Sequence, residues 1–252
     1  MQHNFVSTKS EKDQFAIIQI SHHFLGSMNP WKLLDKTEIP NGGGELKLLQ
    51  REDEFSIRLS GNRGELMNSR LHNSEEALAE LGCAHLKSTV DAQVLIGGLG
   101  MGFTLAAALK VVSQSAKVTV AELIPAVVEW NRGALGERAG KPLLDGRVLI
   151  HTGDVFDLFN KNKPIFDAVL LDVDNGPEGL THSANHRLYS LNGLKAIYNS
   201  LRTEGMLAIW SAVPDDTFLR PLIKAGFKVT TQTVRARVNK GSRHTIFLAK
   251  KP

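Results

Sequence analysis

The sequence predicts an α/β fold: a mostly parallel sheet with helices on both faces and an antiparallel edge hairpin, preceded by a small antiparallel β unit. From Asp91 onward, short apolar runs alternate with amphipathic segments, which is typical of repeated strand–helix units. The chain has 252 residues, of which 42% are hydrophobic and 22% are charged. This length suits one large domain or one domain with a small appendage, and the composition argues against a disordered chain.

The small β unit is predicted from the alternation of apolar and polar residues between positions 45 and 68. Within it, the tetrapeptide Gly-Asn-Arg-Gly at 61–64 is typical of a hairpin turn. Residues 1–40 carry little periodicity, and we assign them no regular element.

A helix is predicted to begin at Asn73, which resembles a capping pair together with Glu76, and to continue to about Lys87. We take this helix as the start of the main domain. Residues 1–73 then form an N-terminal segment with the small β unit, and residues 74–252 form the main domain.

The main domain is predicted to hold a seven-stranded sheet. Five strands are expected at 92–97, 117–121, 147–151, 166–171 and 205–211. Helices are expected near 103–113, 125–134, 187–202 and 216–225. Two further strands, at 227–234 and 244–249, flank a polar turn and predict a closing antiparallel hairpin.

A glycine-rich loop follows the first strand of the main domain, with the sequence Gly-Gly-Leu-Gly-Met-Gly from Gly97 to Gly102. Glycines at Gly98, Gly100 and Gly102 let the backbone turn tightly and approach a ligand closely. The loop does not match the dinucleotide fingerprint, because Phe103 occupies the last glycine position, and no Gly-Lys-Ser/Thr follows to make a P-loop.

Carboxylates follow the next three strands: Glu122, then Asp154, then Asp172 with Asp174. Ligands bind beyond the carboxyl ends of the strands in such sheets, so these acids are expected around one site. Glu122 is placed to accept from ribose hydroxyls and Asp154 from an adenine amino group. Any one of them alone would be a helix cap or a loop residue, but together they predict an adenosine-bearing ligand whose reactive end faces Asp172 and Asp174.

These motifs resemble those of the class I S-adenosylmethionine-dependent methyltransferase superfamily, which has a Rossmann-like fold. Within it the chain is most similar to spermidine synthases, the polyamine aminopropyltransferases. The small β unit before the glycine loop supports this resemblance, as do Gly176-Pro177 and the Arg187-Leu-Tyr189 segment that opens the next helix. The motifs that carry the resemblance are 94–102, 118–123, 153–154 and 166–172.

The resemblance implies an aminopropyl transfer from decarboxylated S-adenosylmethionine to a small amine, with no metal. The glycine loop and Glu122 would hold the ribose and the methionine-derived chain, and Asp154 the adenine. Asp172 would orient and deprotonate the attacking amine, with Asp174 assisting. Alignment of nitrogen, carbon and sulfur would supply much of the rate, because a sulfonium is already a good leaving group.

Three departures from the family pattern keep other functions open. Gly100 stands where the family carries an acid that contacts the donor's free amine, Asp174 comes one residue early, and Ser74 stands where a tyrosine is expected. An S-adenosylmethionine-dependent methyltransferase acting on a small molecule or RNA is therefore the alternative. A nucleoside-binding protein without catalytic activity is a third.

Several other residues have two interpretations. His182 and His186 are four apart, but no accompanying Glu follows His182, so we expect no metal site there and assign His182 to the substrate pocket. Tyr189 is either a core aromatic residue or a pocket wall. Trp130 and Trp210 are expected to pack against the sheet. Cys83 is expected to be a small buried residue.

The expected partners follow from charge and composition. A basic strip near the C-terminus fits a solvated hairpin edge, with nucleic-acid binding as the alternative; it comprises Arg235, Arg237, Lys240, Arg243, His244, Lys250 and Lys251. The single cysteine and the charged first residues favour the cytoplasm. The uncharged stretch at 94–109 is too short and too rich in glycine to span a membrane. We expect a homodimer, supported by the small β unit.

Overall fold

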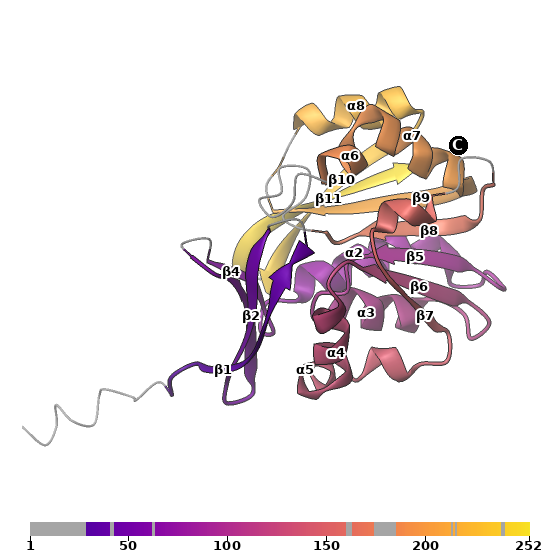
Figure 1. The fold of residues 1–252 in the computed structure, drawn as a ribbon. Coiled ribbons are helices and arrows are strands. Elements are labelled where there is room, and N and C mark those ends of the chain that lie inside the picture. Colours follow the sequence, from indigo (N-terminus) through magenta and orange to yellow (C-terminus); the bar gives the residue numbers. More distant parts are fainter. Residues whose placement is uncertain are drawn as a thin grey trace, which may run out of the picture.

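The computed structural model describes residues 29–40, 43–61, 64–159, 163–173, 185–212, 214, 216–237 and 240–252, which form a large sheet and a small one (Figure 1). The large sheet has seven strands in the order β10-β11-β9-β8-β5-β6-β7. Its strands are β5 (Gln93–Gly97), β6 (Lys117–Glu122), β7 (Val148–Thr152), β8 (Phe166–Leu171), β9 (Leu201–Ser211), β10 (Lys228–Arg237) and β11 (Lys240–Lys250).

The topology of the large sheet confirms the predicted fold class. The five strands from β5 to β9 pair in parallel, whereas β11 pairs antiparallel with both β9 and β10. The chain proceeds from β5 outward to β6 and β7, then returns to place β8 on the other side of β5. This change of direction separates the loops that follow β5 and β8, and it is where α/β sheets bind ligands.

Helices cover both faces of the large sheet because its central strands alternate in side-chain direction. On β5, Val94 and Ile96 pack toward the helices of one face, and Leu95 packs toward those of the other. The first group is α2 (Asn73–Gly82), α3 (Phe103–Val111), α4 (Pro125–Arg132) and α5 (Ala134–Glu137). The second is α6 (Asn185–Tyr189), α7 (Leu191–Ser200) and α8 (Leu219–Ala225). Short 3₁₀ turns occur at Ala84–Leu86, Pro142–Leu144, Val155–Leu158 and Asp216–Phe218.

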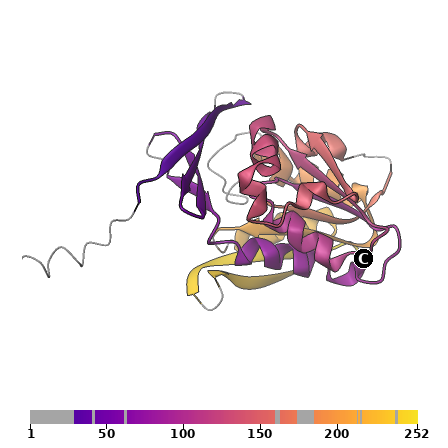
Figure 2. The same ribbon diagram turned by 90° about the horizontal axis from the view of Figure 1, so that it is seen from below.

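The small sheet is antiparallel and stands beside the large one (Figure 2). It confirms the predicted β unit and adds a first strand that the sequence did not reveal. Its strands are β1 (Lys32–Ile39), β2 (Gly44–Arg51), β3 (Glu54–Leu59) and β4 (Glu65–Asn68). β1 is an edge strand whose first five residues are all exposed, so it lacks the alternation that marks a half-buried strand.

Two expectations for local structure were wrong. The predicted helix at 187–202 is two helices, because Ser190 caps α7 by accepting from the Gly193 amide at 3.1 Å. The Asn73 side chain does not cap α2; it donates instead to the Arg235 carbonyl of β10 at 2.8 Å. That bond ties the start of α2 to the edge hairpin.

Trp130, Trp210 and Cys83 take the places that the sequence predicts. Trp130 and Cys83 are buried in the core on the α2–α5 side, and Trp210 packs against it. Trp130 also donates from Nε1 to Asp35 of β1 at 2.7 Å, which joins α4 to the small sheet. Burial raises the pKa of the Cys83 thiol to about 12. No helix in the described part of the chain is long and apolar enough to cross a membrane.

Candidate active site

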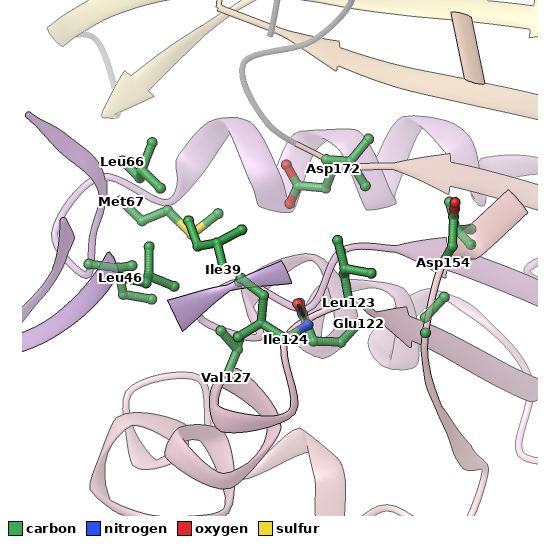
Figure 3. A pocket seen from close by; sticks show the side chains of 17 residues that line it. Ile39, Leu46, Leu66, Met67, Glu122, Leu123, Ile124, Val127, Asp154 and Asp172 are labelled. Atoms are coloured by element: carbon green, nitrogen blue, oxygen red, sulfur yellow. Dashed lines mark hydrogen bonds between the residues drawn. The ribbon is translucent and has the colours of Figure 1, made fainter. Parts of the chain in front are cut away.

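The carboxyl ends of β5, β6, β7 and β8 meet at one cavity of about 160 Å³ (Figure 3). Five of the residues that the sequence analysis selected line it together. They are Gly98, Gly100, Glu122, Asp154 and Asp172. The parallel strands produce this convergence, since each of them delivers the residue that follows it to the same edge of the sheet.

The other selected residues lie elsewhere. Gly102 has a φ of +82° at the start of α3 and does not line the cavity. Tyr189 is buried in the core, with its ring 5.7 Å from that of Phe218, so the core interpretation describes its position. Asp174 and His182 lie outside the described residues.

The glycine loop is held against the end of β8. Gly98 has a φ of +89°, and a Cβ atom there would lie 2.3 Å from the Asp172 carbonyl oxygen. The Gly98 amide donates to Ala121, and the Asp172 amide donates to Gly97. A side chain at Gly98 would therefore separate the loop from the strand that carries Asp172.

Glu122 connects the glycine loop with the start of α4. Its two carboxylate oxygens accept from the Leu99 and Ile124 amides, each at 2.9 Å. Burial raises the pKa of Glu122, and the surrounding backbone amides oppose this rise. Each oxygen keeps a second lone pair, so the carboxylate can also accept from a pair of ligand hydroxyls such as those of a ribose.

Asp154 occupies the far end of the cavity from the small sheet (Figure 3). Its Oδ1 accepts from the Phe156 amide at 2.8 Å, and its Oδ2 pairs with Arg187 at 3.0 Å. The Arg187 guanidinium also lies 3.9 Å from the centre of the Phe156 ring. Sequence reasoning did not foresee this pairing, because the two residues are 33 positions apart in the chain.

Asp172 faces a second acid, Glu75, which the sequence analysis missed. Both line a small recess next to the main cavity, together with Met67 and Gly100. Asp172 accepts from the Thr104 hydroxyl at 2.6 Å, and burial raises its pKa to about 6. Burial, and secondly the charge of Asp172, raise the pKa of Glu75 to about 7. An acid in the first turn of a helix looks like an ordinary favourable charge, so nothing in the local sequence marked Glu75.

The wall of the cavity on the small-sheet side is apolar (Figure 3). It is formed by Ile39, Leu46, Ile57, Leu66, Met67, Ile124 and Val127. Met67 also fills the space beside the glycine loop: a Cβ atom at Gly100 would lie 2.9 Å from its sulfur. The acid that the family pattern places at Gly100 would therefore compete with Met67 for that space.

The described residues contain no group of three or more His, Cys, Asp or Glu side chains arranged to hold a metal ion. The polar groups that line the cavity are carboxylates and the backbone of the glycine loop. These groups suit hydrogen bonding to a nucleoside and to an ammonium group.

Searches with the sequence found no matching family model and no match among curated proteins. Solved structures do match. Spermidine synthase from Thermotoga maritima has a TM-score of 0.68 at 19% identity, over 88% of this chain and 73% of that one. A spermidine synthase in complex with the transition state analogue AdoDATO has a TM-score of 0.67 at 18% identity, with the same shares covered.

A probable spermidine synthase from Corynebacterium glutamicum ATCC 13032 has a TM-score of 0.60 at 15% identity, over 87% of this chain and 79% of that one. At these identities the likeness establishes the architecture and leaves the reaction to be argued from the site. The chain has a spermidine synthase-like fold.

Proposed function

We propose that this protein is a spermidine synthase-like transferase that moves an aminopropyl group from decarboxylated S-adenosylmethionine to a small amine. The adenosine part of the donor would lie between Glu122, at the ribose, and Asp154, at the adenine. The glycine loop would contact the donor's methionine-derived chain. The fold supports this class of reaction, and the grouping of these residues in one cavity supports the binding mode.

The observation that carries the proposal is the pair of acids at the reactive end of the cavity. Asp172 and Glu75 meet there, and no Lys or Arg lines either the cavity or the recess among the described residues. A donor that kept its carboxylate would bring a third negative charge to this pair. An ammonium group would instead be attracted by both acids, in an environment where charge interactions are stronger than in water.

In the proposed reaction Asp172 acts as the base. An acceptor ammonium loses one proton to the carboxylate, which exposes the nitrogen lone pair. The nitrogen attacks the carbon next to sulfur, the carbon–nitrogen bond forms, and the electron pair of the breaking carbon–sulfur bond stays on sulfur. The products are methylthioadenosine and a secondary ammonium, and one proton is released. The selected Asp174 and His182 would complete the acceptor side.

Methyl transfer from S-adenosylmethionine to a small molecule or RNA is the second candidate, and one observation favours it. Gly100 lacks the acid that would contact the donor's free amine, and Met67 occupies the space beside it. In this reaction the same cavity would accept a donor that keeps its carboxylate.

Mass spectrometry of the nucleoside products distinguishes the candidates. The protein is incubated with each donor and a mixed panel of amines. Methylthioadenosine that forms only with the decarboxylated donor and an amine supports aminopropyl transfer, whereas S-adenosylhomocysteine from S-adenosylmethionine identifies methyl transfer. Neither product, together with tight binding of methylthioadenosine, would identify a nucleoside-binding protein without catalytic activity.

We further propose that the N-terminal segment 1–73 covers the cavity of domain 74–252 and supports a homodimer in the cytoplasm. The exposed edge strand β1, which carries Leu33 and Leu34 on its surface, supports a contact between two copies. Light scattering should give the mass of a dimer. A monomeric mass would contradict this part of the proposal.

A further inference from the structure

A chain of hydrogen bonds leads from the acid pair to the edge hairpin. The Ser74 hydroxyl donates to Oε2 of Glu75 at 2.7 Å, and Nδ1 of His244 lies 3.0 Å from the same hydroxyl oxygen. Ser74 is completely buried, whereas His244 on β11 is half-buried. The chain therefore connects the recess beside the glycine loop with a residue close to the surface.

His244 is placed by packing rather than by the charge of its neighbours. In the sequence it belongs to the basic C-terminal strip, but its ring turns toward α2 and lies 4.7 Å from the ring of Trp210. Burial lowers the pKa of His244, which favours the neutral imidazole at pH 7. A neutral imidazole can accept a proton at one nitrogen and release one from the other.

The proposed reaction produces a proton beside the acid pair. The attacking ammonium gives up one proton to the acid pair, and the bound donor and acceptor fill the cavity at that moment. Glu75 is the second carboxylate of the recess and is hydrogen-bonded to Ser74. The Thr104 hydroxyl beside Asp172 leads back to the Glu75 carbonyl oxygen, whereas the Ser74 hydroxyl beside Glu75 leads on to His244.

We propose that Ser74 and His244 form a proton relay that carries the proton released by the attacking amine from Glu75 toward the surface at β11. Asp172, the base, passes the proton across the recess to Glu75. Protonated Glu75 donates to the Ser74 oxygen, the Ser74 hydroxyl proton passes to Nδ1 of neutral His244, and His244 releases a proton from Nε2. No oxidant or other reactant is required. Glu75 and Ser74 return to their starting state, whereas His244 ends as its Nδ1–H tautomer and regains the Nε2–H form by proton exchange before the next turnover. The proposal rests on the proposed transfer reaction.

Few charged groups of the described chain act on this relay. Asp172 and Glu76 raise the pKa of Glu75, and the Ser74 hydroxyl lowers it. On the neighbouring elements, His72 pairs with Glu76 at 3.3 Å, and the Arg235 side chain of β10 is directed to the Gly241 carbonyl. Loss of the Ser74 hydroxyl should therefore raise the pKa of Glu75 further, which leaves the acid protonated up to a higher pH.

The first test measures turnover against pH for Ser74→Ala and for Ser74→Thr, which keeps a hydroxyl. Removing one proton-transfer group should lower kcat by roughly 10²-fold while the Kd of methylthioadenosine stays within about twofold. The acid limb of the profile should move to higher pH in Ser74→Ala, and Ser74→Thr should recover most of the rate. Unchanged kcat and an unchanged profile in Ser74→Ala would overturn the relay.

The second test uses His244→Ala with added imidazole. Imidazole should restore turnover in this variant, because a free base can take the proton from Ser74. The control is His85→Ala, in which the replaced histidine lies outside the site, and imidazole should not change its turnover. If His244→Ala folds but imidazole has no effect, His244 only supports the structure.

The third test does not depend on turnover. Nitrogen NMR should detect a change in the tautomer or the pKa of His244 in Glu75→Gln relative to the unmodified chain. An unchanged His244 signal would overturn the relay even if the transfer reaction is confirmed. A wild-type protein that forms no methylthioadenosine would instead contradict the proposed function, whatever the NMR result.

Discussion

Replacing Asp172 with asparagine should make the free protein more stable while it stops turnover. Burial raises the pKa of Asp172 from an ordinary 3.8 to about 6, a difference that corresponds to ~3 kcal/mol in favour of the protonated form. The folded protein thus binds this proton more tightly than the unfolded chain does. As the pH rises from about 4 through 6, the fold loses that amount of stability, because a buried carboxyl must ionise.

Asparagine removes this cost and keeps an oxygen that can accept from Thr104, as Asp172 does at 2.6 Å. Water in the cavity reduces the gain, so Asp172→Asn should raise the free energy of unfolding by ~1 to ~3 kcal/mol at pH 8. For a chain of this length that is roughly 2–12 °C in Tm. The gain should vanish near pH 4, where the wild-type carboxyl is protonated.

Thermal unfolding at pH 4 and pH 8 measures this, with Asp154→Asn as the matched control. Asp154 also lines the cavity, but it pairs with Arg187 at 3.0 Å, so its replacement should not stabilise the fold. Turnover of Asp172→Asn should fall by roughly 10²–10⁴-fold, the usual contribution of a general base, with nucleoside affinity nearly unchanged. If Asp172→Asn is no more stable than the wild type at pH 8, or if it loses nucleoside binding together with turnover, the assignment of Asp172 is wrong.

Three further predictions concern Glu122, the glycine loop and the pair of acids. Glu122→Gln should weaken methylthioadenosine binding by roughly 10- to 100-fold in calorimetry. The glutamine amide has a single acceptor oxygen, which cannot serve the Leu99 and Ile124 amides and also a ribose. Affinity within twofold of the wild type would refute this. Gly100→Asp should lower Tm, since its Cβ would lie 2.9 Å from the Met67 sulfur, and Met67→Ala in the same chain should recover part of the loss. Turnover should fall as the pH drops below about 7, where Asp172 and Glu75 become protonated, and a rate independent of pH between 5.5 and 8 would contradict their role.

The large sheet could be predicted because the sequence of each strand by itself shows the pattern of a buried strand. Each central strand is a short apolar run that is buried on both faces, and the alternation of Val94, Leu95 and Ile96 between the two helical layers needs only the strand period. The residues that end these strands could be predicted for the same reason. A parallel sheet brings Glu122 and Asp172 to one edge whatever the details of packing.

The parts that could not be predicted depend on contacts between distant segments. Glu75 becomes a site residue only because α2 packs beside α3 and directs that carboxylate toward Asp172. Arg187 of α6 meets Asp154 in the same way. The strand β1 was missed because it is exposed over most of its length, so its sequence does not alternate between apolar and polar residues. It forms a strand through its pairing with β2.

The comparison of the two donors by calorimetry tests the central claim most directly, namely that the reactive end of the cavity is a site for cations. Decarboxylated S-adenosylmethionine and S-adenosylmethionine differ by a single carboxylate, which Asp172 and Glu75 would repel. The decarboxylated donor should bind at least about 10-fold more tightly at pH 7.5, a difference of ~1.4 kcal/mol. Equal affinity, or tighter binding of S-adenosylmethionine, would contradict the account.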